Sequence, residues 1–361
     1  MAEVRIGRLV DHHCHGLVTE DLDRAGFEAM MNEAVRASPL GTTLFDSMLG
    51  LAIRRWCAPV LDLEPLAPAD DYLARRRQLG ATEVNRRLVA AAGIGEFLVD
   101  TGLNPGRLCT PGDLAAMSGG AGREIIRLEW VAEQVLQAGT SDFAGEVVQR
   151  LQGSGAVGAK SIAAYRVGLE LPGTKPTTDE LVRAVAAVDP SRLVDPTVSG
   201  WLAWTAVELA MPLQFHVGYG DSDLDLLACD PLRLTAFLRA TEEHGVPVLL
   251  LHNYPFHRNA AYLAQVFDHV FMDLGLATHN TGALSKGVLR EVLEVVPFGK
   301  LLFSSDAYGL AELYLLAAQL FRVGLSAVLD ELVAGGDMTD ADATYVAGLV
   351  ARDNARRVYR L

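Results

Sequence analysis

Short apolar runs recur along the chain, and each ends in a polar or ionisable residue. The runs show no alternation of apolar and polar positions, which is typical of parallel strands covered on both faces. There are eight of them, at residues 8–15, 95–102, 124–130, 156–163, 212–218, 246–253, 269–275 and 300–307.

Segments with apolar positions at helical spacing lie between these runs. The clearest are residues 145–152, 179–188, 230–245, 258–267 and 287–296. Strand and helix alternating eight times predict a (β/α)₈ barrel, with an open doubly wound sheet as the alternative. The last stretch, 338–361, is expected to form one amphipathic helix that closes the barrel.

The connection between the first two runs is much longer than one helical crossover needs. Residues 17–94 form an insertion with helical patterns over 43–56, 70–80 and 82–93. Connections of this length are usually functional or form interfaces. We expect a helical insertion that acts as a lid over the barrel mouth or as a contact between subunits. No linker-like stretch divides the chain, so one domain over 1–361 is expected.

Charge and composition limit the classes of molecule that the protein is expected to bind. The 361 residues carry a formal net charge of −14, which argues against nucleic acid and membrane surfaces and leaves a small-molecule substrate. The N-terminus lacks the apolar stretch of a signal peptide. The four cysteines form no CxxC pair, so a cytoplasmic protein without disulfides is expected.

The strongest chemical signal is the pair His13 and His15 in the first run. Residues two apart on a strand point to the same side, so both imidazoles can reach one metal ion. The insertion follows this strand directly, which places the pair at the carboxyl end of the barrel, where active sites of such barrels lie. His12 points the other way and is interpreted as structural.

Two further runs end in residues that suit a divalent metal. His216 ends the fifth run and Asp306 ends the eighth. Imidazole and carboxylate together accept Zn²⁺, Mn²⁺ or Fe²⁺. Asp306 can also take a proton from an attacking water, so we expect it to be both ligand and catalytic residue.

The sixth run ends in His252, followed by Asn253 and Tyr254. His252 is predicted either to bind a second metal or to hold the substrate beside the first. Asn253 and Tyr254 are candidates for lining the substrate pocket. The remaining histidines do not end strands and are interpreted as non-catalytic, although His257 and His279 lie in loops that could reach the pocket.

Lys160 lies in the fourth run among apolar residues, where an unpaired charge is costly. Three interpretations are open: a carbamylated lysine that bridges two metals, an ammonium that binds a substrate carboxylate together with Arg166, or a buried ion pair with Glu129 or Asp100. Glu129 and Asp100 could instead orient the ligand histidines.

The order of these residues resembles that of the amidohydrolase superfamily. The resemblance rests on D-x-H-x-H at 11–15, with His216, His252 and Asp306 on later strands. The phrases FLVDTG, AKSIAAYRVGL, FHVGYGDSD, LLHNYP and FSSDAYGLAELY resemble the subgroup that also occurs fused to glutamine-synthetase-like domains. The resemblance implies a TIM barrel and one or two divalent ions, commonly zinc. It places Lys160 where binuclear members carry a carbamylated lysine.

These observations predict a metal-dependent hydrolase that activates water to cleave an amide or other C–N bond of a small molecule, and leave open whether that molecule carries a carboxylate. The alternative is a decarboxylase or sugar-acid isomerase with a single metal at the same site. A non-catalytic barrel is the third reading, disfavoured because every expected ligand position is filled. A homo-oligomer is compatible with the insertion forming an interface.

Overall fold

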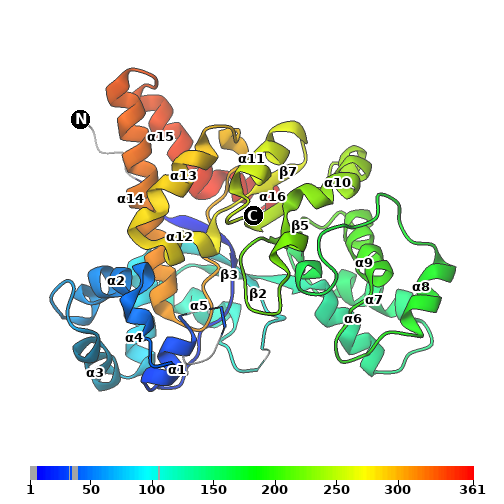
Figure 1. Cartoon of the computed structure of the whole chain (residues 1–361), viewed down its shortest axis with the longest axis horizontal. Helices are drawn as coiled ribbons and strands as arrows, with labels where there is room; N and C mark the ends of the chain where they lie inside the picture. The colour runs from blue at the N-terminus through cyan, green and yellow to red at the C-terminus, as the bar shows by residue number, and fades with distance from the viewer. Residues whose placement is uncertain (1–5, 32, 35–39, 105) are drawn as a thin grey trace.

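Seven parallel strands form one sheet in the order of the chain, at the centre of the molecule (Figure 1). The computed structural model describes residues 6–31, 33–34, 40–104 and 106–361. The strands coincide with seven of the eight apolar runs, which confirms a parallel α/β fold. They are β1 (Leu9–Cys14), β2 (Ile94–Asp100), β3 (Ala121–Arg127), β4 (Gly158–Ser161), β5 (Leu213–Val217), β6 (Val248–His252) and β7 (Val270–Met272).

The eighth run is not a regular strand, which corrects the sequence prediction. Leu301 forms an isolated parallel bridge with Met272 of β7, and Leu302 N donates to Met272 O at 2.9 Å. On the other side, His12 N of β1 donates to Phe303 O at 3.2 Å. The segment thus joins β7 to β1 by hydrogen bonds.

The carboxylate of Asp11 explains why this segment departs from strand geometry. It accepts hydrogen bonds from Ser305 N at 2.8 Å and from Ser305 Oγ at 2.5 Å. The side-chain oxygens of Asp11 therefore accept hydrogen bonds where a regular strand would bond to the backbone of its neighbour. The next residue, Asp306, has a φ of 50°, in the left-handed region, far from the φ of a regular strand.

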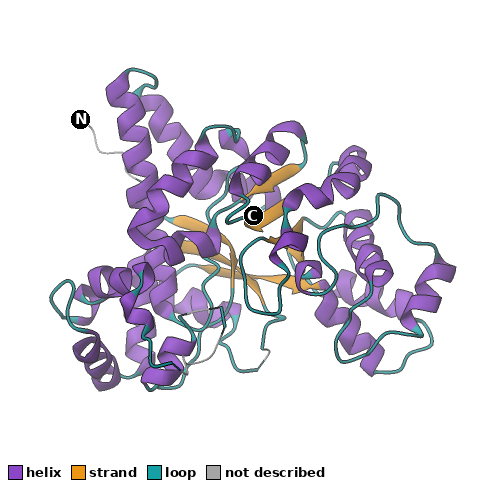
Figure 2. Ribbon diagram, in the orientation of Figure 1, coloured by secondary structure: helices purple, strands orange, loops and turns teal. Residues whose placement is uncertain are grey.

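Helices surround the sheet (Figure 2). Five of the predicted helical segments overlap α7, α8, α10, α11 and α13. Beyond β2, the α-helices are α5 (Pro111–Ser118), α6 (Leu128–Gln137), α7 (Phe143–Gly153), α8 (Thr178–Val185), α9 (Pro196–Glu208), α10 (Thr235–Thr241), α11 (His257–Val266), α12 (Gly275–Thr281), α13 (Ser285–Leu293), α14 (Ala311–Gly335), α15 (Asp340–Gly348) and α16 (Asn354–Tyr359).

The long connection between β1 and β2 carries four further α-helices. They are α1 (Arg24–Ala29), α2 (Met48–Ala52), α3 (Ala69–Leu79) and α4 (Ala81–Ala92). Positions 32 and 35–39 of this connection lie outside the described residues. The buried ion pair between Arg76 of α3 and Glu312 of α14, 2.9 Å long, ties the connection to the rest of the chain.

Helix α14 is long and apolar enough to cross a membrane by length and composition, with a mean hydropathy of 1.4. However, 72% of that stretch is buried inside the protein. It packs against α4, α12 and α13, so its apolar surface is covered by neighbouring helices. Its composition therefore reflects its place in the core.

The C-terminal stretch, predicted as one helix, consists of α15 and α16 joined by a wider helical turn over Leu349–Asp353. Val358 and Tyr359 of α16 pack against the buried residues Val10, Leu98 and Leu251 of three strands. These strand residues form a core cluster of their own, separate from the larger one. The C-terminal helix therefore packs against the sheet interior.

Candidate metal centre

The imidazoles of His13 and His15 converge on one carboxylate. His13 Nε2 lies 3.1 Å and His15 Nε2 lies 3.4 Å from Oδ1 of Asp306. Both histidines are buried, at the carboxyl end of β1. The backbone of Asp306 lies beside the same strand, because its N–H donates to the carbonyl oxygen of His13 at 3.0 Å.

His252 approaches the same carboxylate from β6. Its Nδ1 lies 3.3 Å from Oδ2 of Asp306. His252 and Asn253 have φ values of 67° and 62°, so the chain turns sharply at the end of the strand. The carboxylate of Asp273 supports this turn, since its Oδ1 accepts from His252 N at 2.7 Å. Left-handed non-glycine residues of this kind cluster at functional sites.

His216 stands next to this group on β5. Its ring centroid lies 4.6 Å from those of His252 and Tyr165, and its Nε2 is buried without a hydrogen-bond partner among the described residues. The atoms of two sets lie within 4.8 Å of one another: His13, His252 and Asp306, and His13, His15 and Asp100. In the described side-chain positions, His252 is therefore closer to the other ligands than His216 is.

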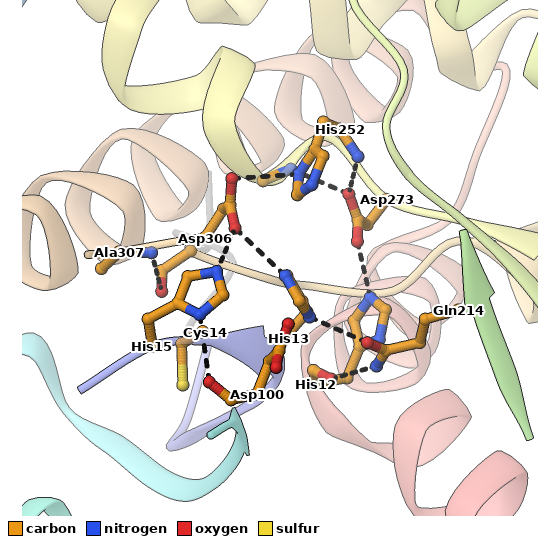
Figure 3. A network of polar contacts seen from close by, with 12 residues as sticks. His12, His13, Cys14, His15, Asp100, Gln214, His252, Asp273, Asp306 and Ala307 are labelled. Atoms are coloured by element: carbon orange, nitrogen blue, oxygen red, sulfur yellow. Dashed lines mark hydrogen bonds and ion pairs between the residues drawn. The ribbon is translucent and has the colours of Figure 1, made fainter. Parts of the chain in front are cut away.

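Backbone and amide oxygens orient the two N-terminal histidines (Figure 3). His13 Nδ1 lies 2.8 Å from Oε1 of Gln214, and His15 Nδ1 lies 3.2 Å from the carbonyl oxygen of Asp100. Nδ1 must be protonated to donate to these oxygens. Each Nε2 then keeps its lone pair on the side of Asp306, as a metal ligand requires.

Burial favours the neutral form of three of these histidines. It lowers the pKa of His13 to about 4, and the neighbouring Lys160 ammonium acts in the same direction. Burial also holds the pKa of His216 and of His252 well below the usual range. Burial would raise the pKa of Asp306, but its contacts with the histidines outweigh that effect and lower it strongly. Neutral imidazoles around an ionised carboxylate are the protonation states that bind a divalent cation.

The donor set fits a metal ion. His13 Nε2, His216 Nε2 and His252 Nδ1 are buried, and none has a hydrogen-bond partner in the described structure. Buried polar atoms are rarely left without a partner, so several together point to a missing ligand. Nitrogen and carboxylate donors suit Zn²⁺ and related ions.

The cluster opens into a cavity of about 380 Å³. Met30 and Glu33 of the β1–β2 connection contribute to its wall. Burial, with the neighbouring Asp306 and Asp221 carboxylates, raises the pKa of Glu33 to about 8. A volume in this range accommodates a small metabolite.

Lys160 lies where the prediction placed it, in β4, and its side chain lines the cavity and is 2% exposed. Burial lowers its pKa to about 8, against the opposing effect of Asp306 and Asp100. Arg166 also lines the cavity, but its guanidinium is paired with Glu133 at 3.2 Å.

Tyr254 is not among the residues that line the cavity, in contrast to the prediction. Its side chain is 36% exposed, and its ring stacks on His257 with centroids 5.8 Å apart. The left-handed turn at His252 and Asn253 sends the chain away from the cavity. Asn253 is buried and donates through Nδ2 to the carbonyls of Leu250 and Asp273, so it holds the turn together.

Other predicted roles differ as well. Asp100 orients His15 with its carbonyl oxygen, while its carboxylate accepts from Arg127 at 2.6 Å. Glu129 pairs with neither Lys160 nor a ligand histidine: it accepts from Ser161 Oγ at 2.7 Å and Ile162 N at 3.0 Å. Hence neither carboxylate forms the ion pair with Lys160 that the sequence left open.

Among the other histidines, His279 lines the cavity, whereas His257 lies 2.7 Å from Glu291. Sequence reasoning missed Gln214 and Asp273. Gln214 lies two residues before His216 on β5, on the same side of the strand, and Asp273 follows the end of β7. The strand-end rule that selected His216 would also have selected Asp273.

The fold and the donor set are those of the amidohydrolase class of enzymes, and comparison with known proteins agrees. The amidohydrolase family model matches residues 130–361, more than half of the chain, so the chain belongs to this family. The matched part contains His216, His252 and Asp306; His13 and His15 precede it.

Particular relatives cover nearly the whole chain. A solved structure described as a candidate metal-dependent hydrolase from Lactobacillus casei is 28% identical, with a TM-score of 0.83 over 99% of this chain and 96% of that one. Protein fluG from Emericella nidulans is 27% identical over 98% of this chain, which spans 46% of its length. Uronate isomerase from Thermotoga maritima, 14% identical with a TM-score of 0.63 over 98% and 94% of the two chains, shares the fold.

Proposed function

We propose that the protein is a metal-dependent hydrolase that activates water to cleave an amide or other C–N bond of a small molecule. One observation carries the proposal: buried nitrogens that have no hydrogen-bond partner in the described part of the chain converge with an ionised carboxylate at the wall of a cavity. We further infer that the segment 301–307 completes a closed (β/α)₈ barrel, which its hydrogen bonds to β1 and β7 support.

His13, His15, His216 and Asp306 would hold the ion, and His252 is placed either to join them or to polarise the scissile carbonyl. When bound, a divalent cation supplies Lewis acidity, which makes water a nucleophile near neutral pH. We propose zinc, since three imidazoles and one carboxylate are a common zinc donor set; Mn²⁺ and Fe²⁺ fit the same donors.

Asp306 is the group that moves protons. It is ionised at neutral pH and can accept a proton from the attacking water. A carboxylic acid with a low pKa gives the proton up readily to the leaving amine. The neutral imidazoles cannot take this proton while their lone pairs face the ion.

The β1–β2 connection is proposed to cover the cavity, because Met30 and Glu33 line it just beyond the end of α1. The helices of this connection are also proposed as a contact between subunits. Light scattering of the purified protein tests this, because it measures the molar mass of the particle in solution. The absence of nucleic acid and membrane partners and the cytoplasmic location remain expectations from composition.

The test is an assay of metal-reconstituted protein against a panel of amides, with amine release as the readout. Chelated protein should be inactive, and Zn²⁺, Mn²⁺ or Fe²⁺ should restore turnover. Replacing Asp306 with Asn should reduce turnover at least a hundredfold with folding retained. Carbon dioxide release or isomerisation of a sugar acid, without amine release, would establish the predicted alternative and refute the hydrolase.

A further inference from the structure

Two cationic side chains lie side by side on the wall of the cavity. Arg127 at the end of β3 and Lys160 in β4 are partners in register, and both side chains line the cavity. Neighbouring strands are about 4.8 Å apart, and residues in register point to the same face. Both are buried, with 9% of Arg127 and 2% of Lys160 exposed.

Asp306 and Asp100 offset part of the charge of Lys160, but within the described residues neither cation uses all of its donors on a carboxylate. Arg127 donates from Nε and Nη2 to one oxygen of Asp100, at 3.0 and 2.6 Å, and its Nη1 makes no hydrogen bond to a described residue. No hydrogen bond or ion pair joins the Lys160 ammonium to another residue within the described parts of the chain. A buried cation without a partner is costly, so this arrangement is suited to an incoming anion.

The other basic residues of the cavity are already paired. Arg166 lies 3.2 Å from Glu133, and Arg192 lies 3.2 Å from Asp223. The side chains of Arg192 and Asp223 are half exposed, so this pair lies towards the opening of the cavity. Among the described residues that line the cavity, Lys160 is therefore the cation left to bind an entering anion.

Lys160 is also close to the metal ligands. It is in register with Gln214 of β5, the residue that orients His13 and lies two positions before His216. A substrate carboxylate bound by Lys160 would thus lie only a few bonds from the substrate group that reacts beside these histidines. Arg127 adds donors from the opposite side of Lys160.

We propose that Lys160 and Arg127 form a carboxylate subsite, so that the substrates are amides that carry a free carboxylate a few bonds from the scissile carbonyl. The amide part of this description rests on the proposed function; the carboxylate part rests on the two cations. Arg127 replaces Arg166 as the predicted partner of Lys160.

The experiment measures binding and does not depend on turnover. Zinc-loaded protein is titrated with N-acetylglycine, N-acetylalanine and N-acetylglutamate, each compared with its carboxamide. At least one acid should bind about tenfold or more tightly than its carboxamide. Lys160→Ala should remove that preference, so that acid and carboxamide bind alike, whereas Lys175→Ala, on the ion pair with Glu208 outside the cavity, should keep the preference of the wild type.

A second, conservative variant tests the subsite in case Lys160→Ala does not fold. Arg127→Lys keeps a positive charge next to Asp100 but loses the guanidinium fork, so it should fold and weaken acid binding severalfold. Thermal unfolding of each variant verifies the fold. Equal binding of acid and carboxamide, no binding by any acid, or an unchanged preference in Lys160→Ala would overturn the subsite.

Chemical rescue separates this subsite from a carbamylated lysine. Adding propylammonium to Lys160→Ala should restore the acid preference, since it supplies the missing cation. Restoration by propionate instead would identify a carbamate at this position and overturn the proposal. A clear acid preference without hydrolysis of any amide would leave the subsite standing and refute the proposed function.

Discussion

Oε1 of Gln214 accepts a hydrogen bond from Nδ1 of His13, over a distance of 2.8 Å. The orientation of the amide is fixed, because its nitrogen donates to the carbonyl oxygen of His12 at 2.8 Å, and a carbonyl can only accept. Oε1 must therefore face His13, and Nδ1 must carry the proton. The hydrogen bond consequently determines which nitrogen of His13 is available to a metal ion.

Replacing Gln214 with Leu should weaken metal binding about 10- to 100-fold, because His13 loses the partner that sets its tautomer and orientation. The measurement is a zinc titration in competition with a chelating dye. Gln137→Leu makes the same chemical change at an exposed position on α6 and should leave affinity unchanged. Equal affinity in the two variants would show that Gln214 does not act through His13.

A substitution at Tyr359 tests the hydrogen bonds that hold Gln214 in place behind His13. Its hydroxyl lies 2.7 Å from Gln214 Nε2 and 3.1 Å from His12 Nδ1. Tyr359→Phe should lower the free energy of unfolding by about 1–3 kcal/mol, since the buried Gln214 Nε2 and His12 Nδ1 both lose a hydrogen-bond partner. Zinc affinity should change little, because the His12 carbonyl still fixes the amide. Urea denaturation measures the effect, with Tyr345→Phe, 67% exposed, as control; similar losses in both would contradict this account.

The clustering of the candidate metal ligands could be predicted from sequence, because each one lies at the end of an apolar run and parallel strands end at one edge. That reasoning selected Asp306 although its segment is not a strand. The prediction of Asp306 required only that its segment run in the same direction as the strands, so that its last residue lies at the same edge. The side chain of Ser305 and the left-handed turn at Asp306, which break the ladder, depend on contact with Asp11, 294 positions away.

Roles set by long-range partners were beyond sequence reasoning. Gln214 acquires its function from His13 and from Tyr359 at the far end of the chain. Tyr254 was expected in the pocket because it follows His252 closely, but the local backbone turn directs it to the surface. A strand-end rule carries no information about such turns.

His279 provides a test of pH dependence in metal-free protein. Burial lowers its pKa to about 4, so below pH 6.5 the unfolded chain binds a proton that the folded state excludes. This histidine therefore costs stability as the pH falls from 6.5 towards 4, by about 3 kcal/mol in total. The free energy of unfolding of His279→Gln, measured relative to that of the wild type, should therefore rise by that amount as the pH falls from 7 to 4.

Urea denaturation at several pH values measures this difference. His244→Gln, at an exposed position, is the matched control and should run parallel to wild type. A constant difference between wild type and His279→Gln across this range would mean that His279 titrates normally in the fold.

Metal removal should lower the thermal unfolding midpoint. A ligand present at a hundred times its dissociation constant stabilises the folded state by about 2.7 kcal/mol. Chelation should reverse this stabilisation, and zinc should restore it. In a variant with His13 and His15 both replaced by Ala, zinc should have no such effect. An identical zinc-dependent shift in that variant would place the ion elsewhere.

The most direct test of the metal centre is anomalous diffraction from zinc-soaked crystals, recorded on both sides of the zinc absorption edge. The account predicts a strong anomalous peak within about 2.0–2.2 Å of His13 Nε2 and an oxygen of Asp306. A fully soaked crystal with no peak among His13, His15, His216, His252 and Asp306 would contradict it.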